Sequence, residues 1–226
     1  MEILSAEFFS ALLAIVIIDL VLAGDNAIVI ALAARSLPPQ LRTRAVVWGT
    51  AGAIAVRAVM TLVVVWLLMI PGLLFVGGLA LVWIAYRLLV PKGDSGNAHG
   101  KPVDSFWEAM KTIVIADALM GLDNVLAVAG AAKGSYLLVV LGLLISIPIV
   151  VWGSTLILKW VDRFPVIVYI GAGVLAWTAA QMMLQEPILA PLVEGHFLIP
   201  VVAYASIIGG VLLAGFMAGR RRKQAA

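Results

Sequence analysis

Four aspartates lie within long apolar stretches of the sequence and recur in one local pattern. The pattern D-x5-D-N occurs twice, and its members are Asp19, Asp25 and Asn26, then Asp117, Asp123 and Asn124. A carboxylate at the centre of a transmembrane helix costs about 2.5–3.5 kcal/mol on insertion scales, so four without partners would cost about 10 kcal/mol or more. Each could be protonated or bonded to a neighbouring helix, but the repeated spacing favours one shared site inside the membrane.

The side chains of this pattern offer carboxylate and amide oxygens, which are hard donors suited to Mg²⁺, Ca²⁺ or Mn²⁺. Zn²⁺ or Cu⁺ would call for histidine or cysteine. The chain has no cysteine, and its two histidines, His99 and His196, fall in predicted loops. Met120 stands one turn before Asp123, where it would be either a soft donor that favours Mn²⁺ or ordinary packing. The residues therefore predict a site for a hard divalent cation.

Helix geometry divides the members of each pattern. Asp19 and Asn26 are seven residues apart and share a face of a regular helix, as their counterparts do in the second copy. Asp25 lies about 100° round the helix from Asn26. Gly24 and Gly121 stand beside the patterns, where a local unwinding would turn the second aspartate of each copy inward. The alternative role for these glycines is close helix packing.

Arg57 is a fifth charge within the predicted membrane region. Four carboxylates and one guanidinium sum to −3. A divalent cation brings the sum to −1, and one further proton neutralises it. Because net charge is disfavoured in a medium of low dielectric constant, cation and proton occupancy are predicted to be linked. Arg57 itself would be either an active gate or one half of a structural salt bridge to one aspartate.

The composition of the chain is that of a membrane protein. Of the 226 residues, 64% are hydrophobic and only 12% charged, whereas a soluble domain has about a quarter of its residues charged. The apolar runs are about 20 residues long, enough for helices that cross the hydrocarbon core. We therefore expect an all-α, polytopic membrane protein whose surroundings are the lipid bilayer. The net charge of +3 indicates no nucleic-acid partner, because the basic residues lie at predicted helix ends.

Seven transmembrane helices are predicted, at 7–34, 42–69, 72–90, 107–132, 136–158, 165–184 and 197–219. Lys and Arg set their orientation. One set of loops and helix ends carries thirteen basic residues: Arg35, Arg42, Arg44, Arg87, Lys92, Lys101, Lys111, Lys159, Arg163, Arg220, Arg221, Arg222 and Lys223. The opposite set carries only Lys133. By the positive-inside rule the N-terminus is predicted outside and the C-terminus in the cytoplasm, in the inner (plasma) membrane.

The chain also repeats itself. The first aspartate pattern matches the second at an offset of 98, and a later block, from Pro71/Pro165 to Trp83/Trp177, matches at an offset of 94. This predicts a first three-helix repeat at 1–90, a cytoplasmic linker at 91–104, a second three-helix repeat at 105–184, and a seventh helix with a basic tail at 185–226. Because each unit has an odd number of helices, the second copy must be inverted, which places a shared site near the midplane.

The segments Leu22–Ala31 and Met120–Ala132 resemble the TerC family of integral membrane proteins, and more closely its short YjbE-like branch within the LysE transporter superfamily. The resemblance extends over nearly the whole chain and includes Arg57 and Ile70-Pro71. It implies export of metal ions, Mn²⁺ above all, with Ca²⁺ or Mg²⁺ as alternatives, and a link to metal homeostasis or tellurium resistance. By matching positions it implies that both aspartate patterns form the metal site. The chain departs from the expected pattern at Ala23 and Gly121, where a serine is expected.

Other functions remain as alternatives. An intramembrane aspartyl protease would show Gly-x-Gly-Asp on one helix and Tyr-Asp on another, and this sequence has neither, so we do not expect an enzyme. An amino-acid exporter of LysE type fits less well, because four carboxylates with one arginine suit a cation better than a zwitterion. A factor that supplies metal to exported proteins during assembly is the third alternative. The sequence favours an exporter of divalent cations that exchanges them with protons.

Overall fold

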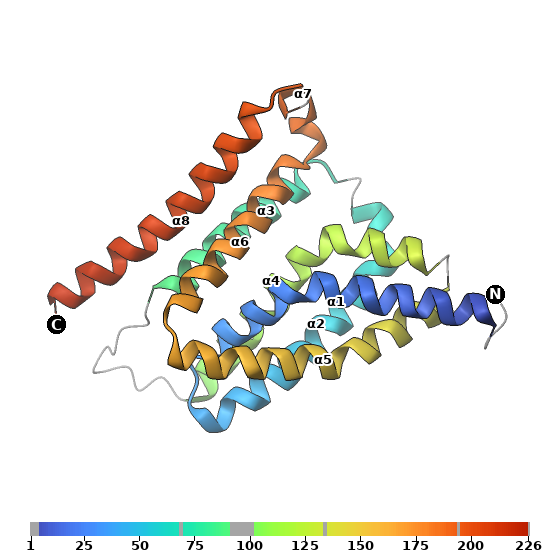
Figure 1. Cartoon of the computed structure of the whole chain (residues 1–226), viewed down its shortest axis with the longest axis horizontal. Coiled ribbons are helices and arrows are strands. Elements are labelled where there is room, and N and C mark those ends of the chain that lie inside the picture. Colours follow the sequence, from blue (N-terminus) through green and yellow to red (C-terminus); the bar gives the residue numbers. More distant parts are fainter. Residues whose placement is uncertain (1–4, 68–69, 91–101, 133–134, 194, 226) are drawn as a thin grey trace.

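In the computed structural model the chain folds almost entirely into helices (Figure 1). The structure describes residues 5–67, 70–90, 102–132, 135–193 and 195–225, and no strand occurs in this part. Within the helices, the side chains of some residues, Asp123 and Asn124 among them, lie outside the description. The all-α prediction is confirmed for the described residues.

Seven long helices account for most of the chain: α1 (Ala6–Ala34), α2 (Pro39–Leu67), α3 (Leu73–Leu89), α4 (Pro102–Ala131), α5 (Tyr136–Arg163), α6 (Val166–Leu184) and α8 (Leu198–Ala225). Each begins and ends within six residues of one predicted span. Between α6 and α8 stand two short elements, a 3₁₀ turn η1 (Pro187–Leu189) and α7 (Ala190–Val193), which the sequence did not suggest.

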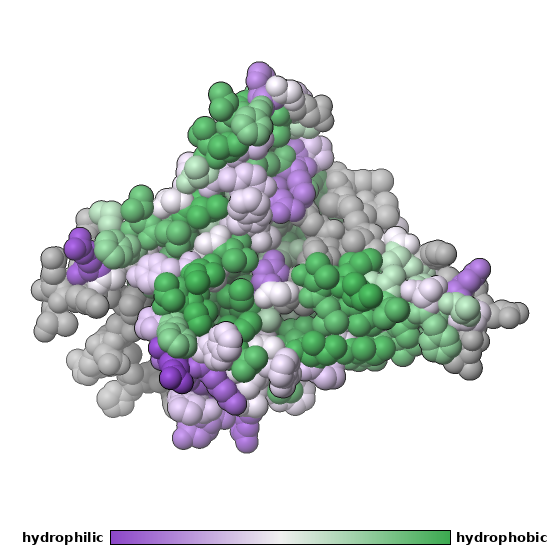
Figure 2. Space-filling model, in the orientation of Figure 1, coloured by the Kyte–Doolittle hydropathy of each residue, from purple (hydrophilic) through white to green (hydrophobic). Residues whose placement is uncertain are grey.

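By length and hydropathy, three of the described helices could each cross a membrane: α5, α6 and Leu198–Arg220 of α8. A fourth span is formed if the two parts of α1, Ala6–Val21 and Gly24–Ala34, are counted together, and these run at 49° to each other. Large apolar side chains are exposed on many of the helices, and Figure 2 shows them as broad hydrophobic areas. Such a surface suits lipid. The full set of seven spans stays a prediction.

The helices gather in two groups that mix the first and second parts of the chain (Figure 1). In one group α1 packs on α5 and α4, and α2 packs on α4 and α5. In the other, α3, α6 and α8 pack on one another. The first group brings the helices that carry Asp19, Arg57 and Asp117 into one bundle.

Two glycines set the close approaches within this bundle. A Cβ atom added to Gly142 of α5 would lie 2.4 Å from Ile15 Cγ2 of α1, and one added to Gly49 of α2 would lie 2.8 Å from Ile113 Cδ1 of α4. Close backbone approach through small residues drives much of helix association in membranes, where the hydrophobic effect gives no net gain. These two contacts therefore fix how α1 and α4 are rotated against their partners.

The orientation can be tested directly because the chain contains no cysteine. Arg44, near the start of α2, and His196, just before α8, are both exposed, and we predict that they lie on opposite sides of the membrane. In intact cells a membrane-impermeant maleimide should label the His196→Cys variant. The Arg44→Cys variant should react only after permeabilisation. If Arg44→Cys were labelled in intact cells and His196→Cys only after permeabilisation, the orientation predicted from the thirteen-to-one charge count would be wrong.

The carboxylate of Glu186 joins the end of α6 to the start of α3. Only 2% of this residue is exposed. Its Oε1 accepts a hydrogen bond from the Gly72 N–H at 2.9 Å, and its Oε2 accepts from the N–H groups of Leu74 at 3.1 Å and Phe75 at 3.4 Å. Gly72 is the N-cap of α3, and the other two N–H groups belong to its first turn, so none of the three has a partner inside the helix. A carboxylate there also interacts favourably with the helix dipole.

Replacement of Glu186 by Gln should therefore destabilise the fold. The amide keeps one acceptor oxygen but turns an NH₂ group toward backbone donors, which leaves buried N–H groups unpaired at about 1–3 kcal/mol. Thermal unfolding of the purified protein in detergent should show a lower midpoint for Glu186→Gln. The adjacent, exposed Gln185 supplies the control, since Gln185→Ala should unfold like the wild type. Equal midpoints for both variants would remove this role from Glu186.

Candidate cation site

A buried arginine in α2 joins aspartates from the two aspartate patterns. The Nη1 group of Arg57 donates to Asp19 Oδ1 of α1 at 2.5 Å, and its Nη2 group donates to Asp117 Oδ1 of α4 at 2.5 Å. The three side chains are 4%, 2% and 7% exposed, respectively. One guanidinium thus bridges the first aspartate of each pattern. Arg57 thus forms a salt bridge, with two aspartates in place of one, and whether it also acts as a gate stays a prediction.

Local helix geometry explains why these side chains meet. Asp19 follows Ile15 by four residues on α1, and Asp117 follows Ile113 by four residues on α4, so each aspartate shares a face with its isoleucine. Both isoleucines are seated against glycines of the neighbouring helices. Because those contacts fix the rotation of α1 and α4, they aim both aspartates into the same bundle interior.

A small cavity of about 10 Å³ lies beside this triad of Asp19, Arg57 and Asp117. It is lined by Asp19, Asn26, Ile30, Thr50, Ala53, Ile54, Arg57, Asp117 and Val150. A cavity needs a volume of about 10–15 Å³ to hold one water molecule. The cavity therefore has room for one particle of the size of a water or a dehydrated ion.

Several buried polar atoms at the cavity have no hydrogen-bond partner among the described residues. They are Asn26 Oδ1 and Nδ2, Thr50 Oγ1, Arg57 Nε and Asp117 Oδ2. Three of these are oxygens that can accept a proton or coordinate a cation. A buried polar group left unpaired costs about 1–3 kcal/mol, so their concentration around one cavity indicates a binding site.

The charges of the triad do not cancel. Two carboxylates and one guanidinium sum to −1, and all three groups are buried. Excess negative charge in a medium of low dielectric constant is relieved by a bound cation or by a proton. The triad can therefore hold positive charge, and it offers only oxygen ligands with which to do so.

Asp25 points elsewhere. Its Oδ1 accepts from the backbone N–H of Asn26 at 2.9 Å, and its Oδ2 accepts from Thr178 Oγ1 of α6 at 3.5 Å. It does not line the cavity. α1 is assigned as helix across Gly24, and its two parts, Ala6–Val21 and Gly24–Ala34, run at 49° to each other. Asp25 thus lies on the flank of the triad.

The second pattern is described in part. Asp123 and Asn124 belong to α4, which is helical throughout Pro102–Ala131, but their side chains lie outside the described residues. A Cβ atom at Gly121 would lie 3.7 Å from Arg57 Nε, so a serine hydroxyl at this position would be within reach of that unpaired donor. Among the side chains that the structure describes, no group of three or more His, Cys, Asp or Glu could hold a metal ion. Convergence of four carboxylates stays a prediction.

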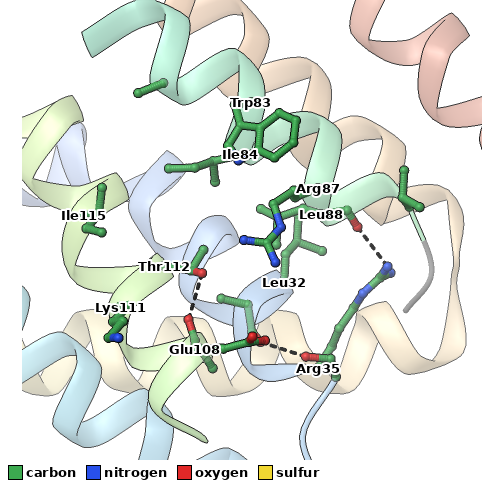
Figure 3. A pocket seen from close by; sticks show the side chains of 15 residues that line it. Leu32, Arg35, Trp83, Ile84, Arg87, Leu88, Glu108, Lys111, Thr112 and Ile115 are labelled. Carbon is green, nitrogen blue, oxygen red and sulfur yellow. Dashed lines mark hydrogen bonds between the residues drawn. The ribbon is translucent and has the colours of Figure 1, made fainter. Parts of the chain in front are cut away.

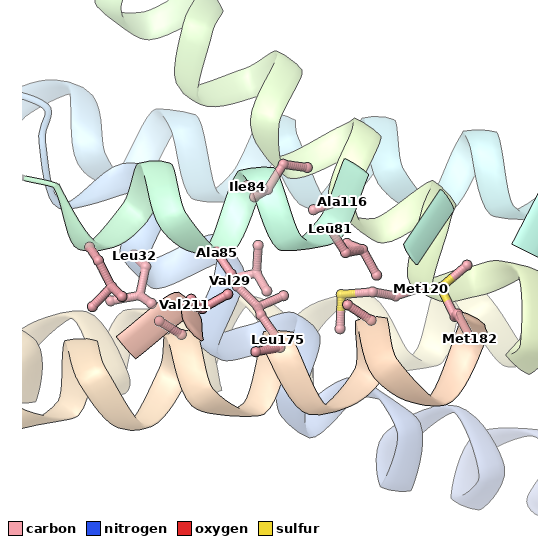
Figure 4. Close-up of a cluster of buried hydrophobic side chains, with 14 of the residues drawn as sticks. Val29, Leu32, Leu81, Ile84, Ala85, Ala116, Met120, Leu175, Met182 and Val211 are labelled. Carbon is pink, nitrogen blue, oxygen red and sulfur yellow. The ribbon is translucent and has the colours of Figure 1, made fainter. Parts of the chain in front are cut away.

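Met120 lies away from the cavity, in an apolar cluster between α3, α4 and α6. It is 2% exposed and packs with buried residues that include Leu81, Leu175 and Met182 (Figure 4). This is the packing role that the sequence left open beside the ligand role.

The two histidines are not part of the cavity lining that the structure describes. His196 is exposed before α8, and His99 lies outside the described residues.

Sequence reasoning missed Thr50 and Thr178. Thr50 precedes Arg57 by seven residues, two turns of α2, so its place on the same face was readable once Arg57 was considered functional. Thr178 had no such signal, because its contact with Asp25 joins residues 153 positions apart.

Comparison with known proteins places the chain among integral membrane proteins. The family model described as "Integral membrane protein TerC family" matches residues 4–225. The "Uncharacterized membrane protein YjbE" of Bacillus subtilis is 43% identical over 206 residues, which cover 89% of this chain and 94% of that protein.

Longer relatives match over part of their length. The "UPF0053 inner membrane protein YoaE" of Escherichia coli is 26% identical over 180 residues, 72% of this chain and 35% of that protein. The "UPF0053 protein YegH" of the same species is 29% identical over 181 residues, 72% of this chain and 34% of that protein. No solved structure matches the chain significantly. The full-length match to the family model and the YjbE identity establish that the chain belongs to the TerC family of integral membrane proteins.

Proposed function

We propose that the protein exports a hard divalent cation, with Mn²⁺ as the first candidate, across the inner membrane in exchange for protons. The observation that carries this proposal is the buried triad of Asp19, Arg57 and Asp117, with its net charge of −1, beside an ion-sized cavity lined by unpaired oxygens. Ca²⁺ and Mg²⁺ are the alternative substrates, because they use the same oxygen ligands.

In this proposal the substrate cation and Arg57 compete for the same carboxylates. Each aspartate gives one oxygen to the guanidinium, and Asp117 Oδ2 remains unpaired. A cation in the cavity would take Asp117 Oδ2 and Asn26 Oδ1 first, and the Asp19 oxygens as Arg57 withdraws. Arg57 returns when the cation leaves, so the empty site is never left with two uncompensated carboxylates.

Proton exchange follows from the same charge balance. A divalent cation changes the triad from −1 to +1 while Arg57 stays close, which is no better tolerated than the empty state. Asp25, on the flank of the triad with Thr178, supplies one further negative charge that offsets the cation. When the cation leaves, its two positive charges are lost, and Asp25 or one triad aspartate takes up a proton to offset part of that loss. Metal ligands bind in the deprotonated form. Entry of metal must then release that proton.

Paired contacts across the bundle support two inverted repeats. Ile15 and Ile113 differ by 98, the offset of the aspartate patterns, and each packs on a glycine of the other repeat. Those glycines, Gly49 and Gly142, differ by 93, and the same offset pairs Arg57 with Val150, which lines the cavity. The site would then lie on the pseudo-twofold axis, with one arginine serving both repeats.

The geometry argues against the amino-acid exporter. An amino acid needs a cationic partner for its carboxylate, and both terminal nitrogens of Arg57 are already bonded to aspartates. The cavity of about 10 Å³ is also too small for an amino acid. The remaining alternative, a metal-supply factor for exported proteins, would use the same site but needs no net flux.

The test is cellular metal content with and without the protein. Cells that produce it should contain less Mn than cells without it when challenged with Mn²⁺, whereas Fe, Co and Zn should be unchanged. Mg and Ca are measured in parallel to rank the alternative substrates. If all six elements were present at the same level with and without the protein, the exporter hypothesis would be excluded and the metal-supply factor would remain.

A further inference from the structure

A second and larger pocket lies between the C-terminal ends of α1 and α3 and the first half of α4. Its volume is about 360 Å³. It is lined by Leu32, Ala33, Arg35, Ser36, Ala80, Trp83, Ile84, Arg87, Leu88, Val90, Glu108, Ala109, Lys111, Thr112 and Ile115. None of these residues belongs to the cation site. Its basic lining residues, Arg35, Arg87 and Lys111, belong to the predicted cytoplasmic side.

The pocket carries an excess of positive charge. Arg35, Arg87 and Lys111 outnumber Glu108 by two charges. Figure 3 shows the Arg87 side chain pointing between α3 and α4. Arg35 is anchored through a hydrogen bond from its Nη2 to the Leu88 carbonyl at 3.0 Å. Both arginines line the pocket, so its net positive charge repels a cation and suits an anion.

The remaining walls of the pocket are apolar. Leu32, Ile84 and Leu88 stand behind the arginines (Figure 3). Trp83 and Ile115, at 59% and 51% exposed, continue the apolar wall outside. Tryptophan is enriched at the membrane interface because its ring is amphipathic. A free inorganic anion would use only the charged part of this pocket, whereas a ligand with a charged head and an apolar tail uses all of it.

We propose that this pocket binds an anionic phospholipid. The lipid phosphate would accept hydrogen bonds from Arg87 and Arg35, since arginine forks match phosphate geometry. Lys111 would add a third positive charge at the rim. The first part of an acyl chain would lie against Trp83 and Ile115. Basic pockets between helices at the cytoplasmic interface are the sites where anionic headgroups are held.

The test uses the purified full-length chain in a neutral detergent, with phosphatidylglycerol, phosphatidylcholine and inorganic phosphate as three probes. Native mass spectrometry counts bound lipid, and thermal unfolding reports stabilisation. The wild type should retain phosphatidylglycerol in preference to phosphatidylcholine and should unfold at a higher temperature with it. Phosphate alone should have little effect. Equal effects of the two lipids would overturn the proposal, and stabilisation by phosphate equal to that by phosphatidylglycerol would replace the lipid with a free anion.

Substitutions then locate the site. Arg87→Gln should weaken phosphatidylglycerol binding about fivefold, the worth of one basic residue near an anionic headgroup, and the Arg87→Gln/Lys111→Gln pair more than about twentyfold. Arg44→Gln removes an exposed charge at the same end of the molecule but outside the pocket, so its binding should match the wild type. Because Arg87 and Lys111 are exposed, these variants should fold. If Arg44→Gln lost phosphatidylglycerol binding to the same extent, the binding would depend on general surface charge and not on this pocket.

Discussion

An Asp117→Asn variant is expected to lose at least about ten- to a hundredfold of its Mn²⁺ efflux while its abundance in the membrane stays near that of the wild type. Even groups that only support metal ligands cost this much when they are changed. The substitution has an added effect here, because it takes the charge of the triad from −1 to 0. A neutral triad has no electrostatic reason to recruit a cation.

The fold should tolerate this change. Asparagine has the size of aspartate and keeps one oxygen that can accept from Arg57 Nη2. The matched control is Asp162→Asn, since Asp162 also forms a salt bridge, with Arg42 at 2.5 Å, but is 51% exposed. Exposed pairs contribute about 0–1 kcal/mol, so this variant should export normally. Asp19→Asn should behave like Asp117→Asn. Full efflux in both triad variants would exclude the triad from the transport path.

Removal of Arg57 has the second largest expected effect, and it acts in two directions. The Arg57→Ala variant should retain bound Mn²⁺ more tightly, because a competing cation is gone, yet turn over more slowly. When metal leaves this variant, two buried carboxylates face each other without a counter-charge. Loss of one partner from a buried ion pair costs about 3–5 kcal/mol if the remaining charge stays ionised.

A double variant separates the charge of Arg57 from its position. Arg57→Ala/Asp117→Asn leaves Asp19 as the single charge and removes the repulsion between two carboxylates, so it should recover part of the stability lost in Arg57→Ala. Efflux should not return, because the second carboxylate is missing. Arg57→Lys keeps the charge but has one ammonium group in place of a fork, and it should be intermediate. Normal turnover in Arg57→Ala would assign Arg57 a structural role only.

Much of this arrangement was predictable from the sequence, because hydrophobic length and helix-breaking residues mark helices locally. The seven predicted segments correspond to α1 through α6 and α8. That Asp19 and Asp117 belong together also followed from the repeat. The sequence alone could not decide whether Met120 packs in the core or binds a metal. That decision needs its neighbours on α3 and α6, which only the structure gives.

What the sequence could not supply were pairings between distant helices. The fork of Arg57 requires the rotation of α1 and α4 about their axes, which depends on Ile15 and Ile113 fitting against glycines of other helices. Glu186 caps α3 through Gly72, which is 114 positions away in the sequence, so no local sequence pattern predicts this contact. The contact of Thr178 with Asp25 is of the same kind.

The most direct test of the proposed transport is Mn²⁺ release from proteoliposomes that contain only this protein. Vesicles loaded with Mn²⁺ should release it faster than protein-free vesicles, and faster still when the outside is made more acidic with the membrane potential clamped. Vesicles with the Asp117→Asn variant should release it no faster than protein-free ones. Wild-type release equal to that of protein-free vesicles would contradict cation transport, and release that ignores the pH gradient would contradict proton exchange and favour a channel or uniporter.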